Sequence, residues 1–268
     1  MSRRVPVYSL DGQKAGEIEL PPIFELQPRP DLISRSFWAE FTHRLQPKGT
    51  DPMAGKRTSA ESFGVGLGIA RLARVKGRGY PRAGQAAGVA GVVKGRAAHP
   101  PRVDKVIYKR LNVKERRLAT AMAIAATSRR DLVLARGHVV PESLDLPVVV
   151  SSDLESLSRT RDLRAFLERL GLWPDVERAA RRSTRGGKAR WRGRAGRPGR
   201  GPLIVVSTDG GISRAAENIP GVDVVLAKDL SVLDLAPGGH PGRLTIWTQG
   251  AISSLPGSLL EVSGIGPR

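Results

Sequence analysis

Basic and aromatic side chains are interleaved in two glycine-rich stretches of the chain. Within residues 71–82 a Lys or Arg recurs every two to four positions, and Tyr80 stands among them. In the second stretch Trp191 lies between Arg190 and Arg192. A guanidinium grips phosphate oxygens with two N–H groups, and an aromatic face can stack on a base. The pattern predicts binding to an irregular polyanion, and folded RNA is the favoured partner.

Most of the excess positive charge belongs to these stretches. Residues 47–102 contain 11 Lys and Arg, 2 acids and 11 Gly, and residues 181–201 contain 9 Lys and Arg and no acid. The other residues hold 24 bases and 23 acids, although the 268-residue chain carries a net charge of +19. Loops longer than about 15 residues are uncommon in a compact domain unless they are functional or disordered. We therefore expect a near-neutral body with two basic extensions.

The composition disfavours several classes of site. The chain has no Cys, so disulfides, thiolate metal ligands and a cysteine nucleophile are excluded. Its four His are scattered, and we expect no metal and no cofactor. No apolar run reaches about 18 residues, and residues 1–10 lack the apolar core of a signal peptide. An anionic membrane is the lesser partner, because glycine-rich stretches do not form amphipathic helices.

The glycine-rich turns do not match a nucleotide-binding fingerprint. Five residues separate the first and last Gly of residues 49–55, one more than a P-loop allows, and no hydroxyl residue follows Lys56. Residues 64–68 alternate glycine with apolar residues and do not form Gly-x-Gly-x-x-Gly. Residues 209–211, Asp-Gly-Gly, follow an apolar run. We interpret them as a tight strand-to-helix turn, because the acid would repel phosphate.

No catalytic set stands out either. Ser207, Asp209 and His240 could be named as a triad, but no Gly-x-Ser-x-Gly elbow surrounds the serine. We interpret His138 and His240 as surface residues or as hydrogen-bonded core residues. The acids of the body are spread along the chain without a paired-carboxylate spacing. The chain is therefore predicted not to be an enzyme.

Apolar patterns outside the basic stretches predict a mixed α/β body. Residues 5–20 are typical of a β-hairpin around Asp11-Gly12, and apolar runs predict strands at 147–150, 203–206, 222–226 and 244–247. Periodic patterns predict helices at 31–45, 113–127, 160–170, 174–182, 212–218 and 231–235, and a short helix at 62–75 is a further option.

Caps and the order of elements refine this expectation. We expect N-caps at Asp31 and Thr160, a capping box of Asn112 with Glu115, and a helix stop at Gly171. Strands that alternate with helices predict a parallel sheet with flanking helices, in a Rossmann-like three-layer arrangement. The expected architecture is one globular α/β domain over residues 1–268. It is interrupted by a long extended loop, residues 47–102, and a basic RNA-binding loop, residues 181–201.

Several of these segments have a specific counterpart. The chain resembles the universal large-subunit ribosomal protein four family, in its archaeal and eukaryotic branch. The residues that carry the resemblance are Lys-Arg-Thr-Ser-Ala-Glu-Ser at 56–62 with Gly64, Ala-Arg-Leu-Ala-Arg-Val at 70–75, Val-Lys-Gly-Arg-Ala-Ala-His-Pro-Pro at 93–101, Asn-Val-Lys-Glu at 112–115, and Gly-Lys-Ala-Arg at 187–190 with Arg192.

The resemblance implies a structural protein of the cytoplasmic ribosome, with an α/β domain on the outer side of the large subunit. A long loop would thread through ribosomal RNA to the peptide exit tunnel; it corresponds to residues 47–102, with its tip among residues 71–92. The implied partners are large-subunit ribosomal RNA, neighbouring large-subunit proteins and the nascent peptide near the tip, without homo-oligomers. No catalytic or metal residues, and no counterpart of the eukaryotic C-terminal extension, are implied.

The expected RNA contacts combine the basic stretches with the family motifs. They are Lys56, Arg57, Arg71, Arg74, Lys76, Arg78, Tyr80, Arg82, Lys94, Arg96, His99, Arg185, Lys188, Arg190, Trp191, Arg192, Arg194, Arg197 and Arg200. Two alternatives remain: a nucleotide-dependent RNA-processing enzyme that uses the α/β core, and a free RNA chaperone or assembly factor.

Overall fold

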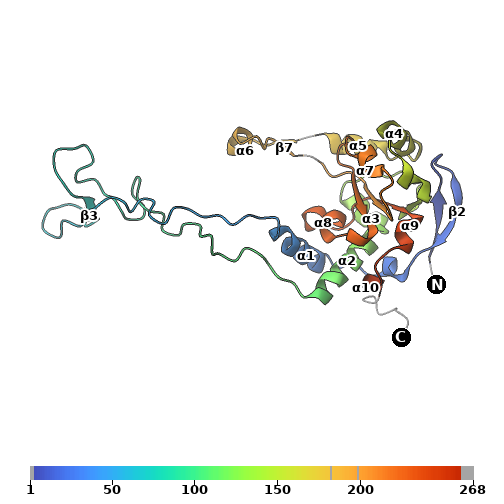
Figure 1. Cartoon of the computed structure of the whole chain (residues 1–268), viewed down its shortest axis with the longest axis horizontal. Helices are drawn as coiled ribbons and strands as arrows, with labels where there is room; N and C mark the ends of the chain where they lie inside the picture. Colours follow the sequence, from blue (N-terminus) through green and yellow to red (C-terminus); the bar gives the residue numbers. More distant parts are fainter. Residues whose placement is uncertain (1–2, 182, 198, 261–268) are drawn as a thin grey trace. The chain divides into compact units, whose positions relative to one another are not determined.

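The computed structural model describes residues 3–181, 183–197 and 199–260, except for the side chains of Arg197 and Leu260. Two units make up the chain (Figure 1): a body, within residues 1–43 and 109–268, and an insert, residues 44–108. Arg182, where a helix was expected to end, lies outside the described residues.

A six-stranded sheet forms the centre of the body, with the strand order β2-β1-β5-β10-β8-β9. Its strands are β1 (Arg4–Tyr8), β2 (Lys14–Glu19), β5 (Val148–Val150), β8 (Leu203–Val206), β9 (Asp223–Leu226) and β10 (Thr245–Thr248). Only the β1–β2 pair is antiparallel; the other neighbours are parallel. The mostly parallel α/β sheet is confirmed. The last strand, β10, lies between β5 and β8, and the finer Rossmann-like comparison stays a prediction.

Helices bury both faces of the central strands β5, β8 and β10, which explains why these strands are continuously apolar. Val149, Val205 and Trp247 face one apolar cluster, whereas Val148 and Ile204 face the other. Successive side chains of a strand point to opposite faces, so neighbouring apolar residues fill two cores. The first cluster includes residues of α1 (Pro30–Thr42), α2 (Val113–Thr127), α8 (Val232–Leu235), α9 (Gln249–Ser253) and α10 (Gly257–Leu260), and the second includes residues of α3 (Arg130–Ala135), α4 (Thr160–Arg169), α5 (Trp173–Ala180) and α7 (Ile212–Ala216).

The predicted helix caps are mostly wrong. Asp31 lies inside α1 and pairs with Arg29 at 2.7 Å, while Pro30 occupies the first helical position, where its missing N–H is not needed. Asn112 occupies the N-cap position of α2, as predicted, but its side chain makes no capping hydrogen bond. Thr160 is the first residue of α4 and not its cap.

The stop predicted at the end of α4 is confirmed. Gly171 has φ 70°, and the N–H of Leu172 returns to the carbonyl of Leu167 at 2.9 Å. This is the Schellman pattern, in which a residue with positive φ ends the helix.

The insert leaves and re-enters the body between α1 and α2. The N–H of Lys109 donates to Thr42 Oγ1 at 3.0 Å, and Thr42 is buried. Both residues belong to the body. The last turn of α1 is thereby tied to the segment that leads into α2.

Regular structure in the insert is limited to two short antiparallel strands, β3 (Ala60–Glu61) and β4 (Arg74–Val75). The optional helix at 62–75 is wrong. Gly64, Gly66 and Gly68 have φ of 84°, 88° and 68°, and such residues interrupt a right-handed helix.

Another small antiparallel pair lies in the second basic stretch. Ser183–Thr184, β6, pairs with Gly196–Arg197, β7, and the short helix α6, Gly187–Trp191, lies between them. We call residues 183–197 the basic hairpin. The remaining elements are the 3-10 turns η1 (Pro22–Glu25), η2 (Ser152–Ser156), η3 (Ala227–Asp229) and η4 (Pro237–Gly239).

Candidate nucleic-acid interface

A small backbone framework holds the middle of the insert. The Val75 N–H donates to Gln85 O at 2.9 Å, and the Gly84 N–H donates to Val75 O at 3.1 Å. The Ala87 N–H donates to Ala73 O at 2.9 Å. Val75 and Ala87 are the buried apolar residues of the insert. These bonds join residues 73–75 to residues 84–87, and the pairing of β3 with β4 adds a third pass of the chain around a minimal core.

Two of the predicted RNA-binding bases of the insert already have acidic partners. Arg57 pairs with Asp51, and Lys76 pairs with Glu61 across β3 and β4. The backbone N–H of Met53 and then Arg57 lower the pKa of Asp51, and the hydrogen bond from Lys76 lowers the pKa of Glu61. These pairs are exposed, so water screens them and each contributes little to stability.

Arg74 has a structural role in the insert. It is half-buried, and its Nη1 donates to Gly84 O at 3.0 Å. Its Nε is buried without a hydrogen-bond partner among the described atoms. The guanidinium therefore fastens two passes of the framework, and its predicted contact with RNA stays a prediction.

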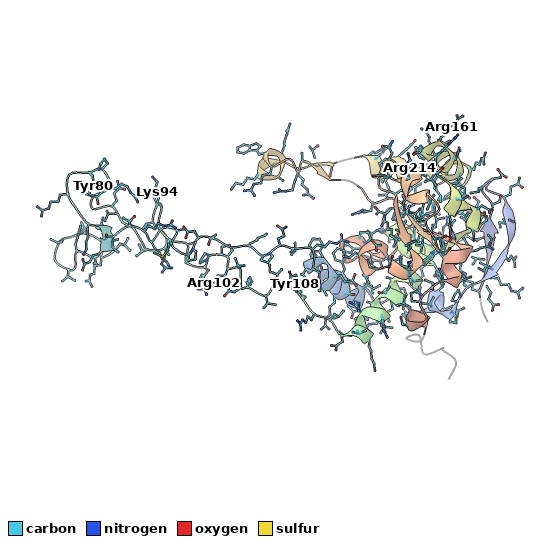
Figure 2. The ribbon with its side chains drawn as sticks, in the orientation of Figure 1. Tyr80, Lys94, Arg102, Tyr108, Arg161 and Arg214 are labelled. Carbon is cyan, nitrogen blue, oxygen red and sulfur yellow. The ribbon has the colours of Figure 1, made fainter. Side chains whose placement is uncertain are left out.

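Tyr80 is held at the turn that follows β4. Its hydroxyl donates to the Lys76 carbonyl, and a Cβ on Gly77 would lie 2.8 Å from the Tyr80 ring. Tyr80 is 44% exposed, so part of its surface can still stack on a base. Figure 2 shows Tyr80 and Lys94 toward one end of the insert and Arg102 and Tyr108 toward the other.

Two segments of the insert, which we call its legs and which include Gly55 and Gly95, cross so closely that glycine is required. A Cβ on Gly55 would lie 2.5 Å from the backbone of Gly95 and Arg96. This contact brings the family motif at 56–62 next to the motif at 93–101. Lys94, beside the crossing, is the non-glycine residue with positive φ among the described residues, at 59°.

The other predicted contacts of the insert have no ion-pair partner among the described residues. Their side chains are exposed, except that Arg96 is partly buried. They are Lys56, Arg71, Arg78, Arg82, Lys94, Arg96 and His99.

The basic hairpin presents its bases differently from the insert. Trp191 is 88% exposed at the end of α6. The described bases around it are exposed and form no ion pair within the described chain; they are Arg185, Lys188, Arg190, Arg192 and Arg194. An aromatic face beside unpaired guanidinium groups is what stacking and phosphate binding require. The side chain of Arg197 lies outside the described residues.

Arg200 stands apart from the hairpin. Its Nη1 donates to Asp223 Oδ2 at 2.8 Å, and its carbonyl accepts from Arg178 Nη2 at 2.7 Å. It is thus bonded to the body through β9 and α5.

The residues tested for catalysis are spread over different structural roles. Asp209 Oδ1 accepts from the N–H groups of Gly211 and Ser213, which is the expected strand-to-helix turn. His138 is buried against Asp175 at 2.9 Å, as a satisfied core residue, whereas His240 is exposed. No group of potential metal ligands occurs among the described residues. The described helices are also too short or too polar to cross a membrane.

Sequence reasoning missed a buried carboxylate at the carboxyl ends of β8 and β10. Glu155 accepts hydrogen bonds from the N–H and hydroxyl groups of Ser207 and Thr208, and from the hydroxyl of Thr248. Burial alone would raise its pKa, but these bonds lower it to about 2. Ser207 is therefore a structural donor, and no local sequence signal links it to Glu155.

Comparisons with known proteins agree on one family. The family described as "Ribosomal protein L4/L1 family" matches residues 18–258. A protein of Saccharolobus islandicus named "Large ribosomal subunit protein uL4" is 51% identical over 93% of this chain and 92% of its own length. The protein of the same name in Saccharolobus solfataricus is 49% identical over 95% of this chain and 94% of its own length. The one in Methanopyrus kandleri is 50% identical over 96% of this chain and 99% of its own length.

The chain combines an α/β body with basic, glycine-rich segments, and it is similar to these relatives over nearly its whole length. These are the characteristics of a ribosomal protein. The chain belongs to the ribosomal protein L4/L1 family. The resemblance inferred from residues 56–62, 70–75 and 93–101 is confirmed.

Proposed function

We propose that the protein is a structural constituent of the large ribosomal subunit, located in the cytoplasmic ribosome, and that it binds large-subunit ribosomal RNA. The names of its relatives support the assignment to the subunit. The observation that carries RNA binding is the basic hairpin, where an exposed Trp191 stands among bases without acidic partners. Large-subunit RNA supplies both the phosphates and the unpaired bases that such a surface would contact.

The proposal divides the chain by function. Residues 1–268 act as one α/β domain of Rossmann-like, three-layer type, interrupted by the loops 47–102 and 181–201. The near-neutral body holds the ends of the two loops, and the basic side chains of the loops neutralise RNA phosphates. Ordering a loop residue costs about 1–2 kcal/mol of backbone entropy. Contacts with phosphate offset part of this cost, while glycine lets the backbone approach an irregular surface.

The longer loop is proposed to reach the wall of the polypeptide exit tunnel. Residues 71–92, which include β4 and the Tyr80 turn, would lie nearest the nascent peptide. Neighbouring large-subunit proteins are the further partners, without homo-oligomerisation. The names of the relatives, which describe ribosomal proteins, support a role without enzymatic activity.

The salt dependence of RNA binding tests this proposal. The affinity of the full chain for a large-subunit RNA fragment should fall steeply with salt, since each neutralised phosphate releases counterions. The double variant Arg190→Gln/Arg192→Gln should reduce the slope of log K against log salt by about 0.7–0.9 for each lost phosphate contact. The matched control is Arg161→Gln/Arg214→Gln. These arginines are exposed on the body (Figure 2) and form no ion pair with another described residue. An affinity that does not depend on salt contradicts the proposal.

Photo-crosslinking tests the tunnel assignment separately. A photoreactive residue at Tyr80 should capture a stalled nascent chain in purified ribosomes, and the same probe at Tyr108 should not. Equal labelling from both positions contradicts the expected tip.

A further inference from the structure

A hollow of about 600 Å³ lies on the body, outside the insert and the basic hairpin. It is bordered by the C-terminal end of α3, by α5 and by the segment after η4. Three guanidinium groups line it, from Arg136, Arg178 and Arg200, together with His138. Leu132 supplies part of its apolar wall.

The three guanidiniums reach the hollow from fixed positions. Arg178 Nε donates to the buried Asp175 at 2.9 Å, and its Nη2 donates to the Arg200 carbonyl at 2.7 Å. Arg136 Nη2 donates to the Pro237 carbonyl at 2.8 Å, and its Nη1 donates to the carbonyl of His240. A guanidinium has five N–H donors, and these contacts use only some of them. The side chains are thus oriented before any ligand arrives.

Positive charge exceeds negative charge around this hollow. Asp175 compensates Arg178, whereas Asp223 is shared by Arg200 and the buried Arg243. Arg136 has no carboxylate partner among the described residues.

The pKa of Arg136 reflects the same excess of positive charge. Burial is the largest cause that lowers its pKa to about 10, followed by repulsion from Arg243, Arg178 and Arg200. No acid opposes these effects. An anion in the hollow would supply the missing counter-charge.

We infer that this hollow binds a phosphate group, carried either by an RNA strand or by a small phosphorylated molecule. Planar guanidinium groups bind phosphate oxygens in pairs, and three of them suit a group with several anionic oxygens. The apolar wall at Leu132 leaves room for the part of the ligand attached to the phosphate. Only Arg200 is shared with the basic segments assigned to RNA, so the inference does not depend on the function proposed above.

Arginine footprinting on the full chain tests the inference. Phenylglyoxal modification, followed by mass spectrometry, reports each arginine separately. Pyrophosphate at about ten times its dissociation constant should slow modification of Arg136 and Arg178 about tenfold relative to chloride at equal ionic strength. Arg161 and Arg214, exposed elsewhere on the body, are the internal controls and should react at unchanged rates. Equal protection of all four arginines, or of none, overturns the inference.

A second arm identifies the source of the phosphate. If an RNA oligonucleotide without terminal phosphates protects Arg136 and Arg178 to the same extent as pyrophosphate, the bound group is a backbone phosphate. Protection by pyrophosphate alone indicates a free phosphorylated molecule. Arg136→Gln should abolish protection of Arg178 in either case, and retained protection contradicts a shared site. RNA binding through the basic hairpin should persist in this variant, so failure of the two proposals can be distinguished.

Discussion

The hydroxyl of Thr248 donates a 2.5 Å hydrogen bond to Glu155 Oε1 and joins positions 93 residues apart. The same carboxylate accepts bonds from Ser207 and Thr208 at the end of β8. A single buried side chain thus connects the ends of two neighbouring parallel strands with η2.

Removal of the carboxylate should destabilise the body strongly. Glu155→Ala leaves the buried hydroxyl of Thr248 and the half-buried donors of Ser207 without their acceptor, so the free energy of unfolding should fall by roughly 2–4 kcal/mol. Urea denaturation followed by circular dichroism measures this loss. Glu142→Ala is the matched control, because Glu142 is exposed, and it should change the free energy by less than about 0.5 kcal/mol. Equal effects of the two substitutions would contradict the role of Glu155.

The same group should make stability depend on pH in acid. The pKa of Glu155 is about 2 in the fold, below its ordinary value of 4.5. A depressed pKa stabilises the folded state above the unfolded value and loses that contribution as pH falls. The contribution of Glu155 should therefore be complete above pH 4.5 and decline toward pH 2. Denaturation midpoints at a series of pH values should show a smaller acid loss in Glu155→Gln than in the parent chain.

Substitution of two glycines of the insert distinguishes the effect of backbone strain at positive φ from the effect of a steric clash with another segment. Gly55 and Gly64 both have positive φ, at 75° and 84°, but only a Cβ on Gly55 meets another segment. Gly55→Ala should force apart the crossing and speed hydrogen exchange of the Gly95 amide about tenfold, which is equivalent to about 1.4 kcal/mol. Gly64→Ala should leave this amide unchanged. Nuclear magnetic resonance exchange rates check the difference, and identical rates in the two variants would refute the crossing.

Base stacking on the basic hairpin should be visible in affinity. Trp191→Ala should weaken binding to large-subunit RNA roughly 5- to 150-fold, because stacking on an aromatic ring contributes about 1–3 kcal/mol. Trp191→Phe should retain most of the affinity. Trp38→Ala is the control, since Trp38 is also partly exposed but packs against Phe37 and Phe41 on α1. Fluorescence anisotropy with labelled RNA measures all three, and an unaltered affinity in Trp191→Ala excludes stacking.

Much of the body could be predicted because its signals are local. The apolar run at 203–206 and the periodic pattern at 113–127 coincide with β8 and α2. Caps were predicted less well, since several residues near a helix start can each accept a bond. At α8, Ser231 Oγ donates to Asp234 Oδ2 at 2.6 Å, a capping contact that was not among the predictions.

The candidate nucleic-acid interface could be predicted only where the local amino-acid composition marks it. Trp191 and its neighbouring bases stand out in any window of sequence. The hollow lined by Arg136, Arg178 and Arg200 does not, because three separate segments supply its side chains. The same reason hid Glu155, whose partners are 52 to 93 residues away. Strand order posed a similar difficulty, because local patterns do not specify which strand pairs with β10.

The bond between Thr42 and Lys109 has a consequence for how the family could vary. Both ends of the insert are fixed by the body, so the chain between them closes a loop whose anchor points do not move. The entropy of loop closure grows only with the logarithm of length, and doubling a flexible loop costs about 0.6 kcal/mol. Insertions and deletions in the legs should therefore be nearly neutral for folding. If the insert binds RNA as proposed, selection on its length would act through the path that it follows along the RNA.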